Sequence, residues 1–148
     1  MNNAISAPAP ALTQDETTMA LLAHILQIFT WWIGPLVIYL VKRDSKFVSF
    51  HAMQALLWQI LVFILAIVGI GLWIILLIAT VVPHAGQASS NQAPPVAFFV
   101  IFPIMWLGIM GLSVTNIVLG IVFGIKASRG EWASYPVIGG WARRIVGV

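Results

Sequence analysis

Two long uncharged stretches dominate the pattern of polar and apolar positions. Residues 17–41 and 47–125 contain no Asp, Glu, Lys or Arg, and most of their positions are apolar. A polar, turn-rich segment at 83–95 divides the second stretch into two. Each of the three resulting runs exceeds the ~20 apolar residues that a helix needs to cross the hydrocarbon core. The pattern therefore predicts an all-α integral membrane helical bundle.

The predicted helices cover about 14–41, 47–82 and 95–128, and their predicted transmembrane parts are about 17–41, 54–82 and 96–126. A four-span arrangement, with one of these runs split, stays open as an alternative. Local signals mark the helix ends. They are a capping box at Thr13 and Glu16, an N-cap at Asp44 or Ser45, and a C-cap at Gly130. Gly34-Pro35 predicts a kink inside the first helix.

The remaining segments define the domain organisation. Residues 1–12 are predicted to be a flexible tail, 13–130 the transmembrane domain, and 131–148 an interfacial segment in which apolar residues mix with an Arg pair. A cleavable signal peptide requires basic residues before its apolar core, and the first residues of this chain carry no basic charge. We therefore expect the first apolar run to remain in the mature protein.

Charge predicts the orientation in the membrane. Only 7% of residues are charged, against about a quarter in soluble domains. All seven Lys and Arg residues fall in two clusters, which are Lys42, Arg43 and Lys46, then Lys126, Arg129, Arg143 and Arg144. The positive-inside rule places both clusters in the cytoplasm. With three spans, the N-terminus then lies outside and the C-terminus is cytoplasmic.

The residue inventory argues against catalysis. The chain has no cysteine, and the only acidic residue between 17 and 125 is Asp44 in a predicted loop. Paired carboxylates, a phosphate-binding glycine loop and a Ser-His-Asp order are missing from the sequence. We therefore predict that the protein is not an enzyme, binds no cofactor or metal, and does not bind nucleic acid.

One face of the third helix carries small and polar residues at four-residue spacing: Asn116, Gly120, Gly124 and Ser128. In lipid, such residues allow two helix backbones to approach closely, and Asn adds an interhelical hydrogen bond. The face predicts helix packing, either against another helix of this chain or against a partner.

Polar residues inside the first helix suggest a second possibility. His24, Gln27 and Thr30 lie in the first apolar run, toward the predicted outer side, and Thr115 and Asn116 lie in the third. They either form hydrogen bonds between packed helices or line an oligomeric channel or transporter for a small solute.

The basic clusters predict a cytoplasmic surface that could bind lipid head groups. Its residues are Lys42, Arg43, Lys46, His51, Gln54, Arg143 and Arg144. Alternatively, His51 and Gln54 anchor the first loop to the third helix.

Several short segments resemble a known family. They are Leu21-Leu22-Ala23-His24, Gly34-Pro35-Leu36, Lys42-Arg43-Asp44, Phe50-His51-Ala52-Met53-Gln54-Ala55-Leu56, Gly130-Glu131-Trp132 and Tyr135-Pro136. Together they resemble a bacterial family of small multi-pass membrane proteins of unknown function. That family is distantly similar to the twenty-kilodalton channel subunit of the chloroplast inner-envelope translocon. Many members have a basic residue where this chain has Met53.

The resemblance implies a helical bundle in a bacterial plasma membrane and a link to protein transport. The residues and the resemblance together predict a non-enzymatic multi-pass membrane protein. It would act through helix–helix contacts as a subunit or assembly factor of a membrane complex. Its expected partners are the lipid bilayer and other membrane subunits or further copies of itself.

Overall fold

The computed structural model describes residues 11–85 and 96–148, and over these residues the chain is helical without strands. The elements are α1 (Gln14–Thr30), α2 (Ile33–Val41), α3 (Lys46–Ala85), α4 (Val96–Ser128) and α5 (Gly139–Val146). The predicted all-α class is confirmed. Most of the predicted flexible tail and of the 83–95 loop lies outside the described residues.

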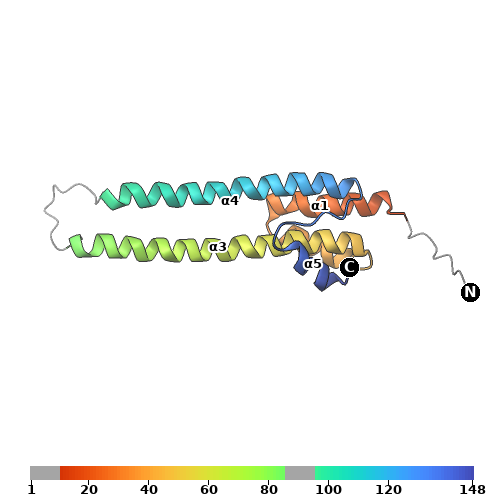
Figure 1. The fold of residues 1–148 in the computed structure, drawn as a ribbon, viewed down its shortest axis with the longest axis horizontal. Helices are drawn as coiled ribbons and strands as arrows, with labels where there is room; N and C mark the ends of the chain where they lie inside the picture. Colours follow the sequence, from red (N-terminus) through yellow and green to blue (C-terminus); the bar gives the residue numbers. More distant parts are fainter. Residues whose placement is uncertain (1–10, 86–95) are drawn as a thin grey trace, which may run out of the picture.

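Two long helices, α3 and α4, lie side by side along the longest axis of the molecule (Figure 1). With 40 and 33 residues, they are about 60 and 50 Å long at ~1.5 Å per residue. Both exceed the ~30 Å hydrocarbon core. They contain the two candidate membrane spans of the described chain, Lys46–Thr80 and Phe99–Ser128. The helix α4 continues through Pro103.

The first apolar run forms two helices instead of the one predicted. The helix α1 ends at Thr30, the chain turns at Trp31-Trp32, and α2 runs back beside it. Trp31 takes a φ of 56°, which no helical residue has. Asp15 and Lys42, the two ends of this hairpin, form an ion pair of 2.5 Å. The prediction of one kinked helix over 14–41 is therefore wrong.

Proline and glycine explain the reversal. Pro35 has no N–H with which to continue the α1 hydrogen-bond ladder. The Thr30 hydroxyl instead accepts the Gly34 N–H at 3.0 Å and donates to the Leu26 carbonyl at 2.8 Å. A Cβ on Gly34 would lie 2.6 Å from the Leu26 Cβ, so the turn requires glycine there.

The reversal changes the topology. The Ser45 hydroxyl donates to the Glu16 carboxylate at 2.7 Å, so the start of α1 and the first basic loop share one end of the molecule. An N-terminus on the opposite side from Lys42 needs a complete crossing by residues 17–41, and the chain makes a return there instead. The predicted opposite placement of these two regions is thus contradicted by the fold.

The C-terminal segment makes a second return. Gly130, with a φ of 76°, ends α4 in a Schellman turn, in which the Glu131 N–H bonds the Lys126 carbonyl at 3.0 Å. Residues 131–138 then run back along α3. The helix α5 reverses again, and Lys46 Nζ donates to its Val146 carbonyl at 2.6 Å.

Three predicted helix ends are confirmed by their hydrogen bonds. Thr13 and Glu16 form the reciprocal capping box. The Ser45 hydroxyl accepts the Val48 N–H at 3.3 Å at the start of α3. Gly130 provides the left-handed C-cap.

The packed core lies entirely at the basic end, where α1, α2 and α5 surround the ends of the long helices (Figure 1). Its clusters include Ala23, Ile38, Val48 and Ala52 on one side and Phe50, Met53, Ala142 and Val146 on the other. By contrast, the most apolar window of α3 is 0% buried. We call residues 67–85 of α3 and 96–114 of α4 the outer half.

The hairpin makes a prediction that a single helix does not. In the double variant Asp15→Cys/Lys42→Cys, a short bismaleimide should join the two cysteines within one chain, because the native side chains touch. A continuous helix would separate these positions by about 40 Å over its 27 residues. Peptide mass spectrometry reads out the link.

The native chain lacks cysteine, so no background link forms. The pair Asp15→Cys/Ser113→Cys, with one position on the outer part of α4, serves as the unlinked control. Equal yields from both pairs would contradict the hairpin.

Candidate functional site: a buried polar network

Polar side chains gather inside the basic end of the bundle, where α1, α3, α4 and residues 131–138 meet. The buried polar residues are His24, Gln27, Ser49, His51, Gln54 and Gln59, and Tyr135 is nearly as inaccessible. Burying such groups without hydrogen bonds costs several kcal/mol each in an apolar surrounding, on the order of 2–7. Their partners therefore decide whether this end can fold.

Two histidines and a tyrosine form the centre of the network. His24 Nδ1 lies 2.9 Å from the Tyr135 hydroxyl, and His24 Nε2 lies 3.0 Å from His51 Nδ1. His51 Nε2 lies 3.1 Å from the Glu131 carbonyl oxygen. The His24 and Tyr135 rings also stack, with centroids 5.3 Å apart. The chain of bonds thus joins α1, α3 and the C-terminal segment.

With both imidazoles neutral, the carbonyl at one end sets the direction of every bond. A carbonyl only accepts, so His51 Nε2 carries a proton and donates it to Glu131. His51 Nδ1 then accepts from His24 Nε2, and His24 Nδ1 accepts from the Tyr135 hydroxyl. Both imidazoles are neutral in this arrangement, and each has one donor and one acceptor in use.

The side-chain amides of Gln54, Gln59 and Asn116 extend the network to α4 and further along the C-terminal segment. Gln54 clasps the C-terminal segment, donating to the Ala133 carbonyl at 3.0 Å and accepting the Tyr135 N–H at 2.5 Å. Gln59 Nε2 donates to the Gln27 carbonyl and to Asn116 Oδ1, both at 2.9 Å. Trp58 Nε1 also donates to Asn116 Oδ1, at 3.1 Å. Side chains of α3 therefore hold both α1 and α4.

The tyrosine hydroxyl remains protonated because of its surroundings. Burial raises the pKa of Tyr135 well above its ordinary value, and the bond from Gln27 Nε2 offsets this only in part. A protonated hydroxyl is what the acceptor His24 Nδ1 requires. Gln27 Oε1 is buried with no hydrogen-bond partner in the described part of the chain.

The residues predicted to line a channel separate into two groups. His24 and Gln27 lie in the network and are 0% exposed. Thr30 and Thr115 are on the outside of the bundle, and each bonds a carbonyl of its own helix, at Leu26 and Gly111. One chain does not bring these residues to a common pathway.

The predicted cytoplasmic surface also divides. His51 and Gln54 are 0% exposed and bond the backbone of residues 131–135, so they lie inside the bundle and not on its surface. They anchor residues 131–135, whereas the predicted alternative had them anchor the first loop to the third helix. Arg144 is exposed.

The other basic residues of that surface have partners within the chain. Lys42 pairs with Asp15, whose hydrogen bond raises the pKa of the Lys42 ammonium. Arg143 donates to the Ser134 hydroxyl at 3.0 Å and to the Trp132 carbonyl at 3.1 Å. Arg43 lies over the Tyr39 ring, 5.9 Å from its centroid.

Gly120 and Gly124 of α4 face α1 of the same chain. A Cβ on Gly120 would lie 2.8 Å from the Ile28 side chain and 3.0 Å from the His24 carbonyl oxygen. One on Gly124 would lie 3.0 Å from Leu21. Ser128 bonds only the Ile125 carbonyl of its own helix. For the Gly120/Gly124 face, the structure therefore favours packing within the chain over packing against a partner.

Sequence reasoning missed Tyr135 and Gln59 as members of the site. The available signal was that both are polar groups beside apolar runs, which must find partners when buried. Their partners lie 108 residues away for Tyr135 to Gln27 and 57 away for Gln59 to Asn116.

Metal binding finds no support in the described residues, where no three His, Cys, Asp or Glu side chains gather. All four ring nitrogens of His24 and His51 already take part in hydrogen bonds.

Comparison with known proteins adds a family. The profile of the MamF/MmsF family, described as the magnetosome magnetite crystal formation protein family, matches residues 15–142. UPF0132 membrane protein MJ1527 of Methanocaldococcus jannaschii is 28% identical over 134 residues, which are 90% of this chain and 72% of that protein. UPF0132 membrane protein MJ1443 of the same organism is 26% identical over 129 residues, 87% and 86% of the two chains. No solved structure matches.

These matches confirm a membrane protein family without an assigned molecular activity. The likeness to the chloroplast translocon subunit and the bacterial origin stay predictions. Protein transport has no support among the matches.

Removing the tyrosine hydroxyl should destabilise the bundle. Tyr135→Phe leaves His24 Nδ1 without its donor and Gln27 Nε2 without its acceptor, and each unsatisfied buried group costs about 1–3 kcal/mol. We expect a lower melting temperature in detergent. Tyr39→Phe, at a half-buried ring, is the matched control and should change stability by less than about 0.5 kcal/mol. Equal melting temperatures for the two variants would refute the role of the network.

Glycine-to-alanine substitutions at two positions of α4 should change the stability in opposite directions. Gly120→Ala drives a Cβ into Ile28 and should destabilise by about 1–3 kcal/mol. Gly108→Ala meets nothing within 4 Å and should stabilise by up to ~1 kcal/mol through helix propensity. Unfolding in detergent measures both. A neutral Gly120→Ala would show that α1 does not pack on this face.

Proposed function

Because the chain belongs to the MamF/MmsF family, the magnetosome magnetite crystal formation protein family, we propose that it is a non-enzymatic membrane protein. It acts as a structural subunit or assembly factor of a membrane complex. The observation that carries this proposal is the contrast between the two ends of the molecule. One end is locked by hydrogen bonds, and the other presents bare apolar helices.

The topology of the proposal follows from charge and from the hairpin. The α3–α4 pair crosses the membrane, and α1, α2 and residues 131–146 stay at the cytoplasmic end with both basic clusters. The N-terminus then lies on the same side as the C-terminus. We place the protein in the plasma membrane of a bacterium as a multi-pass protein.

The outer half supplies surface for helix–helix contacts within the bilayer. Ile75 and Leu107 are 63% and 66% exposed there. Gly108 and Gly111 leave open backbone on α4, as Gly69 and Gly71 do on α3. In lipid, close backbone approach at small residues drives association. The partners are other membrane subunits, copies of this chain among them.

The family description concerns crystal formation, and the proposal gives this chain a part in the membrane that surrounds such a process. Two of its histidines, His24 and His51, already hold the bundle together. Its four acidic residues, which are Asp15, Glu16, Asp44 and Glu131, all lie at the basic end. The structure therefore supports a role in organising the membrane through helix packing. We propose no reaction of iron for this chain.

Cross-linking in the native membrane tests this function. Single cysteines at Leu107 and at Ile75 should give reproducible adducts with a partner or with a second copy, because both positions are exposed in the outer half. Val41→Cys, equally exposed at 66% but on α2, is the matched control and should give none. The chain has no other cysteine. A solitary monomer at both outer positions, with no adduct, would sink the proposal.

A further inference from the structure

Two turning points share an uncommon backbone conformation. Among the described residues, the non-glycine residues with positive φ are Trp31 at 56° and Val137 at 69°. Such a conformation costs on the order of 1–3 kcal/mol, and for a bulky or β-branched residue it is an outlier. Trp31 is the turn between α1 and α2, and Val137 is the turn between residues 131–136 and α5. Each return segment therefore has a strained apolar residue at its tip.

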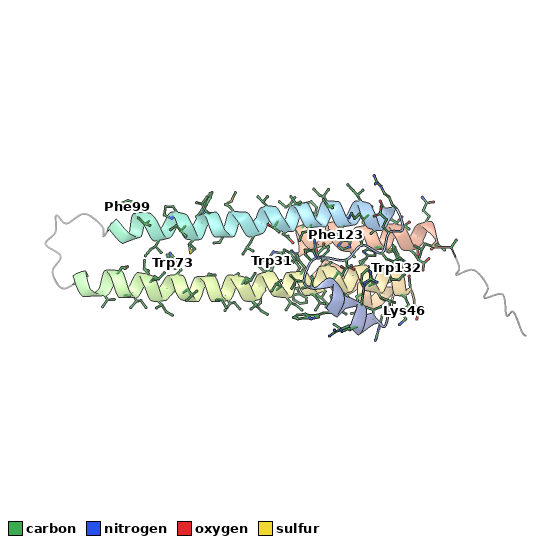
Figure 2. The ribbon with its side chains drawn as sticks, in the orientation of Figure 1. Trp31, Lys46, Trp73, Phe99, Phe123 and Trp132 are labelled. Atoms are coloured by element: carbon green, nitrogen blue, oxygen red, sulfur yellow. The ribbon has the colours of Figure 1, made fainter. Side chains whose placement is uncertain are left out.

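Both tips lie at a similar height along α3. Trp31 and Trp32 border a shallow apolar cavity with Gln59, Val62, Phe63 and Ala66. Trp31 lies between Lys46 and Trp73 in the length of the molecule (Figure 2). Val137 follows Tyr135 in the chain and precedes Ile138, whose cluster packs against Leu57, Trp58 and Leu61. The two segments thus enter from the basic end and turn back near the middle of α3.

The tips and their flanks are apolar and exposed. Trp31 and Val137 are 61% and 81% exposed. Large exposed apolar residues continue along α2 at Ile33, Val37, Leu40 and Val41, and along α5 at Trp141 and Ile145. Exposed apolar surface of this extent on both return segments marks contact with a membrane or a partner.

Charge identifies the lipid leaflet as the occupant. Arg129 and Arg144 lie exposed at the basic end, beyond the apolar tips. Aromatic and aliphatic tips below exposed Arg or Lys are the pattern of segments that lie in the interface of an anionic membrane. The same surface is continuous with the spans α3 and α4, which are already in lipid.

We infer that the α1–α2 hairpin and residues 131–146 form a wedge in the anionic cytoplasmic leaflet, so that the protein favours membranes curved with that leaflet on the convex side. In the part of the chain that the structure describes, α1, α2 and α5 surround the long helices at the basic end, and α3 and α4 alone form the other (Figure 1). It therefore displaces more lipid from one leaflet than from the other. The inference rests on the proposed topology and goes beyond the proposed helix contacts.

Depth measurements test the insertion of the tips. Spin labels on Trp31→Cys and Val137→Cys in anionic vesicles should be relaxed more by oxygen than by a water-soluble nickel complex, as expected in the acyl region. Leu72→Cys, exposed on α3 in the outer half, is the reference for a label within the bilayer. Tips that meet the nickel complex while Leu72 does not would overturn the wedge and leave the proposed crossing of α3 and α4 intact.

Curvature preference is tested by cell-free synthesis in the presence of preformed vesicles of phosphatidylcholine and phosphatidylglycerol, one population small and one large. The basic end stays on the side of synthesis, so the outer leaflet of each vesicle represents the cytoplasmic one. We expect enrichment in small vesicles. The enrichment should weaken in vesicles of phosphatidylcholine alone, because the anionic charge is gone.

The variant Trp31→Asn/Val137→Asn should lose the preference for small vesicles while remaining folded, because Asn tolerates positive φ better than Trp or Val. Leu107→Ala, at an exposed outer position, should keep it. The melting temperature of each variant in detergent verifies the fold. Equal recovery of the native chain in small and large vesicles would overturn the inference, as would a preference that the double variant retains.

Discussion

The rest of the structure depends on one requirement, which is that the two histidines and the tyrosine enclosed by apolar helices find hydrogen-bond partners. The bonds from Tyr135 through His24 and His51 to the Glu131 carbonyl meet that requirement across three segments that are distant in the chain. Each member uses its donor and its acceptor in the one order that the terminal carbonyl allows. Loss of one member leaves at least one buried group unpaired, and in a low-dielectric interior this is costly. The network is therefore what holds the two return segments against the long helices.

The two ends of the molecule differ in how their helices are held together. At the basic end, glycines at 120 and 124 admit α1 closely, and amides at 54 and 59 fix its neighbours. Toward the other end, the described helices present aliphatic side chains outward. A fastened end keeps its shape regardless of what surrounds it. A bare end takes its arrangement from the lipids and subunits around it, which is what a subunit of a larger membrane complex needs.

The sequence was sufficient for the local features and insufficient for the chain's return. Thr13 with Glu16, Ser45 and Gly130 act within a few residues of themselves, so their roles were predictable. The uncharged runs also gave the two long helices to within a few residues. The prediction of a single helix over residues 14–41 failed because the length of this apolar run suits a membrane span as well as a hairpin. The Thr30 hydroxyl and the glycine contact at residue 34 decide between these, and they act only once α2 packs beside α1. His24 and His51 were singled out from sequence, but their meeting with Tyr135 depends on that same return.

The bond from His51 to residue 131 is made to a backbone carbonyl, and the glutamate side chain takes no part in it. Gln54 likewise holds the carbonyl of Ala133 and the N–H of Tyr135. Position along the chain, and not residue identity, is thus what this stretch contributes between Gly130 and the tyrosine. The bonds do not use the side chains at 131 and 133, whereas they do need the spacing of five residues from Gly130 to Tyr135. An insertion or deletion in this segment would shift all three backbone contacts at once, whereas a substitution at 131 or 133 leaves the backbone groups in place.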